Sequence, residues 1–174
     1  MLAGCDIVLA EDTRVSGNLL RHLELRKPLL SCYDFNEEQR SAELERWLAE
    51  DKKIALVCDA GMPLVCDPGY RIVRRAIELG LPVCPIAGPS SALLALVASG
   101  LPCERFAFEG FLPDKAGERH RRLQKVRDDD RTLVFFVAPS ALVSTLEDMQ
   151  AVLGDRKACL ARELTKMYEE FIRG

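Results

Sequence analysis

Short β-branched apolar runs alternate with longer helical patterns along this chain. The runs predict four buried strands in its first half: residues 6–10, 29–32, 54–58 and 82–86. Apolar residues spaced three and four apart predict helices between them, with Thr13 as a possible cap of the first. These helices are expected over residues 15–23, from 36 onward, over 70–79 and over 90–99. Gly80 and Gly100 are expected to end the last two.

Strands and helices that alternate at this spacing predict right-handed crossovers and a mainly parallel sheet. The run Gly100-Leu101-Pro102 marks a boundary, so we expect domains at residues 1–103 and 104–174. Beyond the boundary the pattern predicts a second α/β unit with an unfinished sheet. Its elements are an extended piece over 105–111, helices over 115–126 and 140–153, and strands over 132–137 and 157–161. The predicted fold class is therefore α/β, with two domains of mainly parallel or mixed sheets.

The strand predicted over residues 54–58 ends abruptly in Asp59-Ala60-Gly61, and Asp67-Pro68-Gly69 follows. A buried strand that stops at such residues places backbone amides and a carboxylate at the carboxyl edge of a sheet. Open α/β folds bind ligands at that edge. Gly61 also permits close approach of a ligand to the backbone. The alternative is a plain turn between strand and helix, but the doubled pattern favours a binding loop.

A second candidate loop is Gly88-Pro89-Ser90-Ser91, at the start of a predicted helix. Free amides and hydroxyls there suit a carboxylate or a ribose. The alternative is a plain N-cap, in which Ser90 or Ser91 only completes the helix. No G-x-x-x-x-G-K-[ST] loop is present, so a Walker-type phosphate site is not supported. The two loops are expected to form neighbouring walls of one pocket.

Polar clusters follow two other predicted strands. Glu11-Asp12-Thr13-Arg14 follows the first strand, and Arg162-Glu163-Leu164-Thr165-Lys166 follows the last. Each can position a substrate. The alternative for the first cluster is a solvated turn with a Glu or Asp paired to the arginine, and the alternative for the second is a surface charge cluster. A basic face that could meet phosphates is also predicted, although an acid run at 128–130 follows it. Its members are Lys115, Arg119, Arg121, Arg122, Lys125 and Arg127.

The composition is that of an ordinary globular protein: 174 residues, 48% hydrophobic, 29% charged and a net charge of −3. This charge does not favour a chain that binds polyanions as a whole. No apolar run reaches about 18 residues, and no basic stretch with an apolar core begins the chain, so neither a membrane span nor a signal peptide is expected. The seven cysteines are scattered without a C-x-x-C pair, which predicts reduced core thiols of a cytosolic protein and no metal site.

These motifs together resemble the ribosomal RNA small subunit methyltransferase I group of the tetrapyrrole methylase superfamily. They are EDTR at 11–14, DAGMPLVCDPGY at 59–70, GPSSA at 88–92, GLPCERFAFEGFLP at 100–113 and ARELTK at 161–166. The resemblance runs in order along essentially the whole chain. It implies a cytoplasmic two-domain α/β methyltransferase, usually a homodimer, that uses S-adenosylmethionine. The implied reaction is 2′-O-methylation of a cytidine ribose in small-subunit ribosomal RNA.

The resemblance also implies cofactor contacts from both loops and from the second domain. These residues are Ala60, Gly61, Met62, Val65, Ser90, Ser91, Val137 and Leu164. Methyl transfer requires alignment of oxygen, methyl and sulfur, and a group that accepts or orders the hydroxyl proton. We hypothesise that the substrate side of the cleft consists of Glu11, Asp12, Arg14, Glu163 and Lys166. Which of these is the base stays open.

The chain also departs from the family pattern. A first strand with its Thr-Pro-Ile-Gly-Asn-Leu-type loop is expected to be missing before Met1, and further strands are expected to be missing after Gly174. Pro139-Ser140-Ala141 stands where the family often has Pro-His-Arg or Pro-His-Lys, and Met62 replaces a common Thr. These departures leave a non-catalytic remnant as one alternative. A methylase of a tetrapyrrole or another small acceptor is a second, which EDTR, GFLP and ARELTK argue against.

Overall fold

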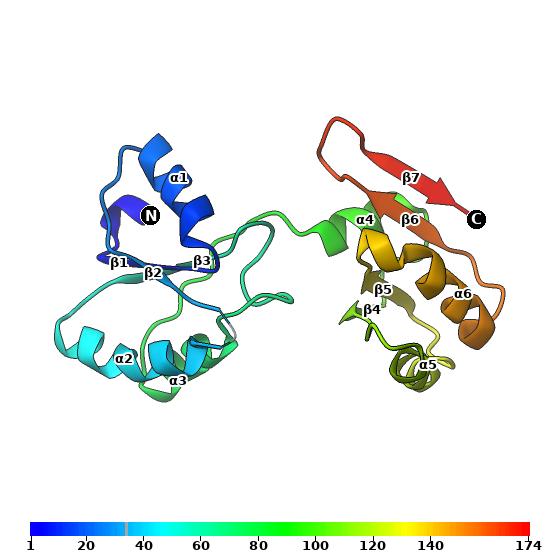
Figure 1. Ribbon diagram of the computed structural model, residues 1–174, viewed down its shortest axis with the longest axis horizontal. Coiled ribbons are helices and arrows are strands. Elements are labelled where there is room, and N and C mark those ends of the chain that lie inside the picture. Colours follow the sequence, from blue (N-terminus) through cyan, green and yellow to red (C-terminus); the bar gives the residue numbers. More distant parts are fainter. Residues whose placement is uncertain (34) are drawn as a thin grey trace. The chain divides into compact units, whose positions relative to one another are not determined.

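Contacts divide the chain into two units, Met1–Pro89 and Ser90–Gly174, in the computed structural model, which describes residues 1–33 and 35–174 (Figure 1). This division falls before α4 (Ser91–Ser99), whereas the sequence predicts a boundary after residue 103. α4 contacts β5 (Thr132–Phe136) and β6 (Cys159–Arg162) of the second unit. Its last carbonyls also accept hydrogen bonds from the Arg173 guanidinium, whose Nε lies 3.0 Å from Ser99 O.

Three parallel strands form the sheet of the first unit: β1 (Ile7–Ala10), β2 (Leu29–Ser31) and β3 (Ile54–Val57). β1 is central, and its Val8 pairs with Leu29 on one side and with Ala55 on the other. All of β1 is buried, as a strand covered on both faces requires. The expected parallel α/β arrangement is confirmed in this unit.

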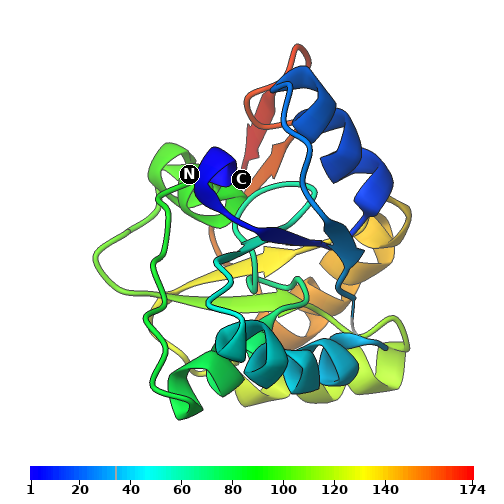
Figure 2. The ribbon, with the colours of Figure 1, turned by 90° about the vertical axis from the view of Figure 1, so that its left-hand side faces the viewer.

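Helices cover both faces of this sheet: α1 (Thr13–His22), α2 (Glu37–Ala49) and α3 (Tyr70–Glu78). Figure 2 shows α1 on one side of the strands and α2 and α3 on the other. Neighbouring residues of β1 supply the two cores, because successive strand side chains point to opposite faces. Leu9 packs in the cluster that contains Trp47, and Val8 packs in the cluster that contains Leu20.

A buried carboxylate ties α2 to the start of α3. Glu37 is 6% exposed and accepts hydrogen bonds from the backbone N–H groups of Gly69 (3.1 Å) and Arg71 (2.5 Å). A helix start leaves such amides without partners, and negative charge suits that end of the helix dipole. Gly69 has φ = 126°, and a Cβ built on it would lie 2.5 Å from Leu56 Cδ2. The turn into α3 therefore requires glycine.

The second unit contains one parallel and one antiparallel pair of strands. β5 pairs in parallel with β4 (Phe106–Phe111), and β6 pairs antiparallel with β7 (Glu170–Arg173). The β6–β7 pairing was not predicted from the sequence, which left β6 without a partner. α5 (Ala116–Lys125) and α6 (Leu142–Leu153) contact each other. Short 3-10 turns, η1 and η2, lie at Leu2–Gly4 and Pro139–Ala141.

The helices are of ordinary globular length. α2 has 13 residues and α6 has 12 residues, which is close to the usual three turns. Across residues 1–33 and 35–174, no helix combines the length and the apolar character that crossing a membrane requires.

The strand predicted over residues 82–86 is wrong, because this segment is irregular. Pro82 and Pro85 have no N–H group to donate to a strand ladder. Val83 and Ile86, which made the segment read as buried, are 42% and 53% exposed. The segment therefore has the amino-acid composition of a strand, but its prolines cannot make the hydrogen bonds of one.

The cysteine expectation is only partly correct. All seven cysteines are free, as expected of reduced thiols. Cys5 and Cys32 are buried, but Cys66, Cys84 and Cys103 are exposed. These three lie in irregular segments rather than in strands, which is why the expectation of a core position is wrong for them.

Replacing Gly69 by Ala should lower the free energy of unfolding by about 2–3 kcal/mol, because the new Cβ would be strained and would displace Leu56. Gly80→Ala is the matched control, since Gly80 has φ = 72° but nothing lies within 4 Å of the added Cβ. The control should lose about 1 kcal/mol. Urea unfolding followed by circular dichroism measures both losses, and equal losses would contradict the close packing at Gly69.

Candidate functional site

The carboxyl ends of β1 and β3 bring together three acidic residues, the adjacent Glu11 and Asp12 and the distant Asp59. The Asp12 N–H donates to Asp59 Oδ1 (3.3 Å), and the Asp59 N–H donates to Glu11 Oε2 (3.4 Å). Glu11 and Asp12 were predicted as site residues, whereas Asp59 was noted only as part of a loop. The pairing of β1 with β3 adds Asp59 to the cluster, and sequence periodicity does not reveal which strands are neighbours.

Asp12 is held by Arg14 and by the start of α1. Its Oδ1 accepts the Arg14 backbone N–H (2.7 Å), and its Oδ2 lies 2.5 Å from Arg14 Nη2. Hydrogen bonding to this guanidinium, followed by the backbone bond, lowers the pKa of Asp12 to about 2, and the same pair raises the pKa of Arg14. Asp12, rather than Thr13, is thus the N-cap of α1. The acid–arginine pair that the sequence offered as the alternative at this strand end is present.

The loop after β3 leaves two backbone amides open. Among the residues the structure describes, the N–H groups of Gly61 and Met62 donate no hydrogen bond, whereas the Ala60 backbone is hydrogen-bonded to Cys58. Gly61 has φ = 76°, and nothing lies within 4 Å of the position a Cβ would take. Val65 is 38% exposed, and its N–H closes a tight turn onto Met62 O at 3.3 Å. A ligand can therefore approach this backbone closely.

The second predicted loop reaches the first one at Gly88. A Cβ built on Gly88 would lie 3.6 Å from Met62 Sδ and 4.0 Å from Gly61 O. The expected closeness of the two loops is thus confirmed inside the first unit. The Met62 side chain lies between the two loops, so a side chain in place of Gly88 would compete with Met62 for the same space.

Beneath this loop a thiol and a carboxylate lie together. Burial first, and then hydrogen bonding to Asp67, raises the pKa of Cys58 to about 11. Burial also raises the pKa of Asp67, and the nearby charge of Asp59 adds to that rise. The Cys58 S–H donates to Ala60 O at 3.2 Å. Cys58 therefore stays a protonated thiol at neutral pH and supports the loop rather than serving as a nucleophile.

Two predicted cofactor residues begin α4 in the second unit. Ser90 is the N-cap, and its hydroxyl oxygen accepts the Leu93 N–H at 3.5 Å. Ser91 is exposed at the first position of the helix. The capping role of Ser90 that the sequence allowed is therefore present. It is compatible with a ligand contact, because a hydroxyl has a second lone pair and a donor hydrogen.

A cavity of about 320 Å³ opens at the carboxyl ends of β4 and β5, within the second unit. Val137, a predicted cofactor contact, is one of the residues that line it. The others are Phe111, Leu112, Pro113, Asp114, Arg119, Phe136, Ala138, Ala141 and Thr145. The sequence marked the Gly-Phe-Leu-Pro run only as a family motif. Its place after a strand was the signal that could have indicated this cavity.

Arg119 anchors one wall of the cavity. It is 5% exposed, and its Nε lies 2.5 Å from Asp148 Oδ2. Its Nη1 also donates to the carbonyl oxygens of Pro113 (3.2 Å) and Asp114 (2.8 Å). The prediction that Arg119 belongs to an exposed basic face is therefore wrong. The arginine lies on the buried side of α5 with Leu123, four residues along the helix.

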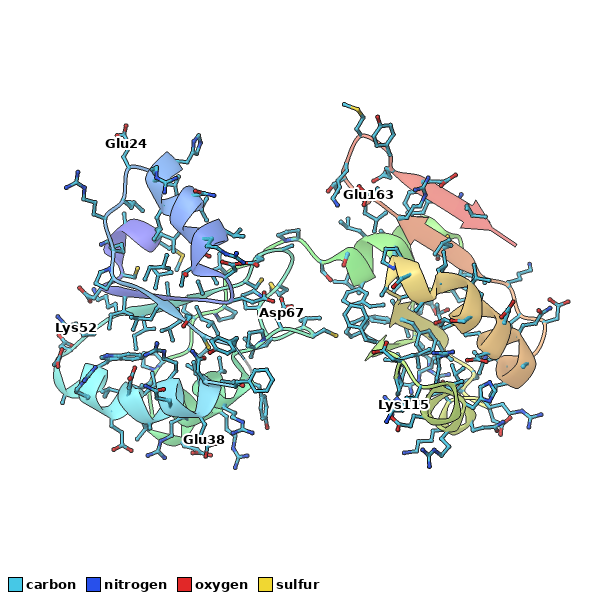
Figure 3. The ribbon with its side chains drawn as sticks, in the orientation of Figure 1. Glu24, Glu38, Lys52, Asp67, Lys115 and Glu163 are labelled. Carbon is cyan, nitrogen blue, oxygen red and sulfur yellow. The ribbon has the colours of Figure 1, made fainter. Side chains whose placement is uncertain are left out.

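Glu163, Leu164 and Lys166 lie in the turn between β6 and β7 (Glu163 is labelled in Figure 3). Lys166 Nζ lies 3.2 Å from Glu163 Oε1, so two members of the predicted charge cluster form an ion pair. Glu163 and Thr165 have φ of 51° and 64°, a conformation that costs non-glycine residues about 1 kcal/mol each. Strain of this kind often marks functional segments.

A model of the family "Tetrapyrrole (Corrin/Porphyrin) Methylases" matches residues 1–174. The chain belongs to this family. The resemblance inferred from the motifs is therefore confirmed. Among solved structures, a cobalt precorrin-4 methyltransferase of cobalamin biosynthesis aligns with a TM-score of 0.62 at 16% identity, over 99% of this chain and 75% of that one. At that identity the likeness concerns the fold, and it confirms the predicted tetrapyrrole methylase-like α/β class.

Curated relatives of this tetrapyrrole methylase carry one name, "Ribosomal RNA small subunit methyltransferase I". The protein of Haemophilus influenzae is 46% identical over 168 residues, which cover 96% of this chain and 59% of the relative. The protein of Thermotoga maritima is 44% identical over 169 residues, which cover 97% of this chain and 76% of the relative. The chain thus spans 59% of the first relative's length and a larger share of the second.

The carboxylate of Asp12 should titrate with a midpoint near 2, below its ordinary value of 3.8, and in Arg14→Ala the midpoint should rise toward that ordinary value. Because the folded pKa is lowered, the stabilisation from this group is present above the unfolded pKa and is lost as pH falls toward about 2. Carbon-detected NMR of the carboxyl group measures the midpoint. An unchanged midpoint in Arg14→Ala would show that Arg14 does not control it.

At about pH 8, iodoacetamide should alkylate Cys58 much more slowly than the exposed Cys84, because the raised pKa of Cys58 leaves little thiolate. Asp67→Asn should speed the alkylation of Cys58 several-fold, since it removes one of the causes of that pKa but leaves the burial. Peptide mapping by mass spectrometry follows each thiol. Alkylation of Cys58 as fast as that of Cys84 in the unmodified chain would refute the raised pKa of the Cys58 thiol.

Proposed function

We propose that the protein is an S-adenosylmethionine-dependent methyltransferase that modifies the 2′-hydroxyl of a cytidine ribose in small-subunit ribosomal RNA. The observation that carries the proposal is the identity of 44–48% to four relatives with one name, over 96–99% of this chain. Membership of a methylase family supports the reaction class. The activity is a proposal because the chain spans part of those relatives.

The loops of the first unit suit such a cofactor. The open N–H groups of Gly61 and Met62, which follow Ala60 in the loop, can donate to the carboxylate or the purine nitrogens of S-adenosylmethionine, and the Asp59 carboxylate can accept from ribose hydroxyls. The open space over Gly61 gives such a ligand room. Val65 supplies an exposed apolar side chain in the same loop. The donor set therefore fits the cofactor.

The second unit supplies the remaining cofactor contacts in this proposal. Ser90 and Ser91 offer hydroxyls at the start of α4, Val137 offers an apolar wall at the end of β5, and Leu164 lies after β6. Each follows a strand or begins a helix. Such positions carry ligand sites in α/β folds because backbone amides and short side chains converge there.

When bound, the cofactor would supply an electrophilic methyl group on a sulfonium. The protein must then orient the ribose hydroxyl and take its proton. With a pKa of about 2, Asp12 is a weak base, so we assign it and Arg14 to orientation of the acceptor rather than to proton removal. Glu11 beside it accepts the Asp59 N–H and completes this edge.

Glu163 and Lys166 supply the substrate side from the second unit. Their ion pair and the hydrogen bond from the Lys166 N–H to Glu163 O (3.0 Å) hold the strained β6–β7 turn in one conformation. A turn fixed in this way can present a cation to an RNA phosphate or a carboxylate to a hydroxyl. We place the acting protein in the cytoplasm as a homodimer, with the small-subunit rRNA or the ribosomal subunit as its partner.

Asp12→Ala and Lys166→Ala should each lower the turnover on small-subunit ribosomal RNA about a hundredfold, because misplacement of the acceptor removes alignment. Asp12→Asn separates chemistry from folding, since asparagine still caps α1. Glu50→Gln, at the exposed C-cap of α2, is the neutral control. Mass spectrometry of nuclease-digested RNA measures 2′-O-methylcytidine. Unchanged turnover in both alanine variants would refute the substrate-side assignment, and the absence of product from the unmodified chain would refute the function.

A further inference from the structure

Ion pairing sorts the basic segment that includes α5 into two groups. Lys115 lies 3.8 Å from Glu118, Arg119 pairs with Asp148, and Arg122 Nη2 lies 2.5 Å from Glu109 Oε2. These cations are neutralised within the fold. Three others form no ion pair or side-chain hydrogen bond among the described residues and are exposed: Arg121, Lys125 and Arg127.

The three unpaired cations lie in the second half of α5 and in the turn that follows it. Arg121 and Lys125 are four residues apart in the helix, a spacing that places their Cβ atoms about 5–6 Å apart on one face. Arg127 follows in the turn that ends the helix, where its N–H donates to Gln124 O. Figure 3 shows nitrogen-tipped side chains that project from α5 away from β4 and β5. We call Arg121, Lys125 and Arg127 the α5 patch.

The acid run that follows the α5 patch is largely neutralised. Asp129 binds the Arg131 guanidinium through both oxygens (3.0 and 2.6 Å), and Asp130 binds Arg105 in the same way (2.9 and 3.1 Å). The Arg131 hydrogen bond lowers the pKa of Asp129 to about 2, so this acid is charged but engaged. The acid run over residues 128–130 argued from the sequence against a basic face here. Because Asp129 and Asp130 are paired with arginines, that argument now rests mainly on Asp128.

We propose that the α5 patch binds the phosphate backbone of RNA. The inference rests on the proposed RNA methyltransferase function and adds the surface that holds the RNA away from the reacting ribose. Unpaired guanidinium and ammonium groups bind phosphates by charge, without reading the bases, and release counterions when they do so. Two of the three cations are arginines, which bind phosphate bidentately. The surface therefore contributes affinity that depends on salt but not on sequence.

The experiment measures RNA affinity as a function of salt. The probe is a fluorescein-labelled RNA hairpin with single-stranded flanks of mixed sequence, and fluorescence anisotropy follows its binding to the 174-residue chain. The variant is Arg121→Ala with Lys125→Ala and Arg127→Ala. The matched control is Arg26→Ala with Arg46→Ala and Lys52→Ala, which removes equal charge from exposed cations of the first unit.

Removal of the α5 patch should reduce the slope of log affinity against log salt by about 2–3, because each phosphate that the protein neutralises adds about 0.7–0.9 to the slope. The control triple should leave the slope within about 1 of the value for the unmodified chain. An unchanged slope in the patch variant, an equal fall in the control, or no RNA binding by the unmodified chain would overturn the inference. An unchanged RNA slope would direct attention to an acidic protein surface as the partner.

Titration of S-adenosylmethionine and the yield of 2′-O-methylcytidine distinguish this inference from the proposed function. A patch variant that binds the cofactor normally but has a lower salt slope supports the RNA surface, even where no methylated product forms. A chain that forms the product with an unchanged slope in the patch variant supports the function and overturns the RNA surface.

Discussion

The parallel pairing of β1 with strands on both of its sides is the constraint on which the first unit depends. β1 is buried along its whole length, and its adjacent residues Val8 and Leu9 supply the cores of the two opposite faces. Parallel pairing also makes the carboxyl ends of β1 and β3 coincide. Glu11, Asp12 and Asp59 meet there because of the register of the sheet rather than because of their spacing in the chain.

Contacts from α2 and at the start of α3 set the geometry of the loop between β3 and α3. Glu37 of α2 holds the first amides of α3, and Gly69 has no room for a side chain beside Leu56. These two contacts fix the far end of the loop that begins at Asp59. The near end is fixed by Asp59 itself, whose N–H is bound to Glu11. With both ends anchored, the amides at Gly61 and Met62 can stay open without loss of order.

Most elements of the fold were predictable from local pattern, because apolar periodicity and glycine stops are local properties. The strand predicted over residues 82–86 was wrong, although its apolar residues favour a strand. Pro82 and Pro85 lack the N–H groups that strand pairing requires. β7 was missed because it is a short strand that follows a long turn over residues 163–169, and such a turn lacks the two-residue signature of a tight hairpin. Arg119 was misassigned because its charge suggested solvent, whereas its position four residues before Leu123 placed it on the buried face.

The site residues show the same limit. Motifs indicated the loops at Glu11 and at Asp59, and the register of the sheet then showed that they meet. Sequence pattern can suggest an ion pair between close neighbours such as Asp12 and Arg14, but not one between different elements. The split between paired and unpaired cations near α5 therefore required side-chain contacts. Likewise, the weak basicity of Asp12 follows from its contact with Arg14.

The most direct test of the account is an amide NMR titration of the chain with S-adenosylmethionine. If the loop after β3 binds the cofactor, the backbone amide signals of Ala60, Gly61 and Met62 should shift with a saturable dependence on cofactor concentration, and those of the distant Glu50 should not. Absence of a saturable shift at these three amides, or shifts confined to other parts of the chain, would contradict the central claim.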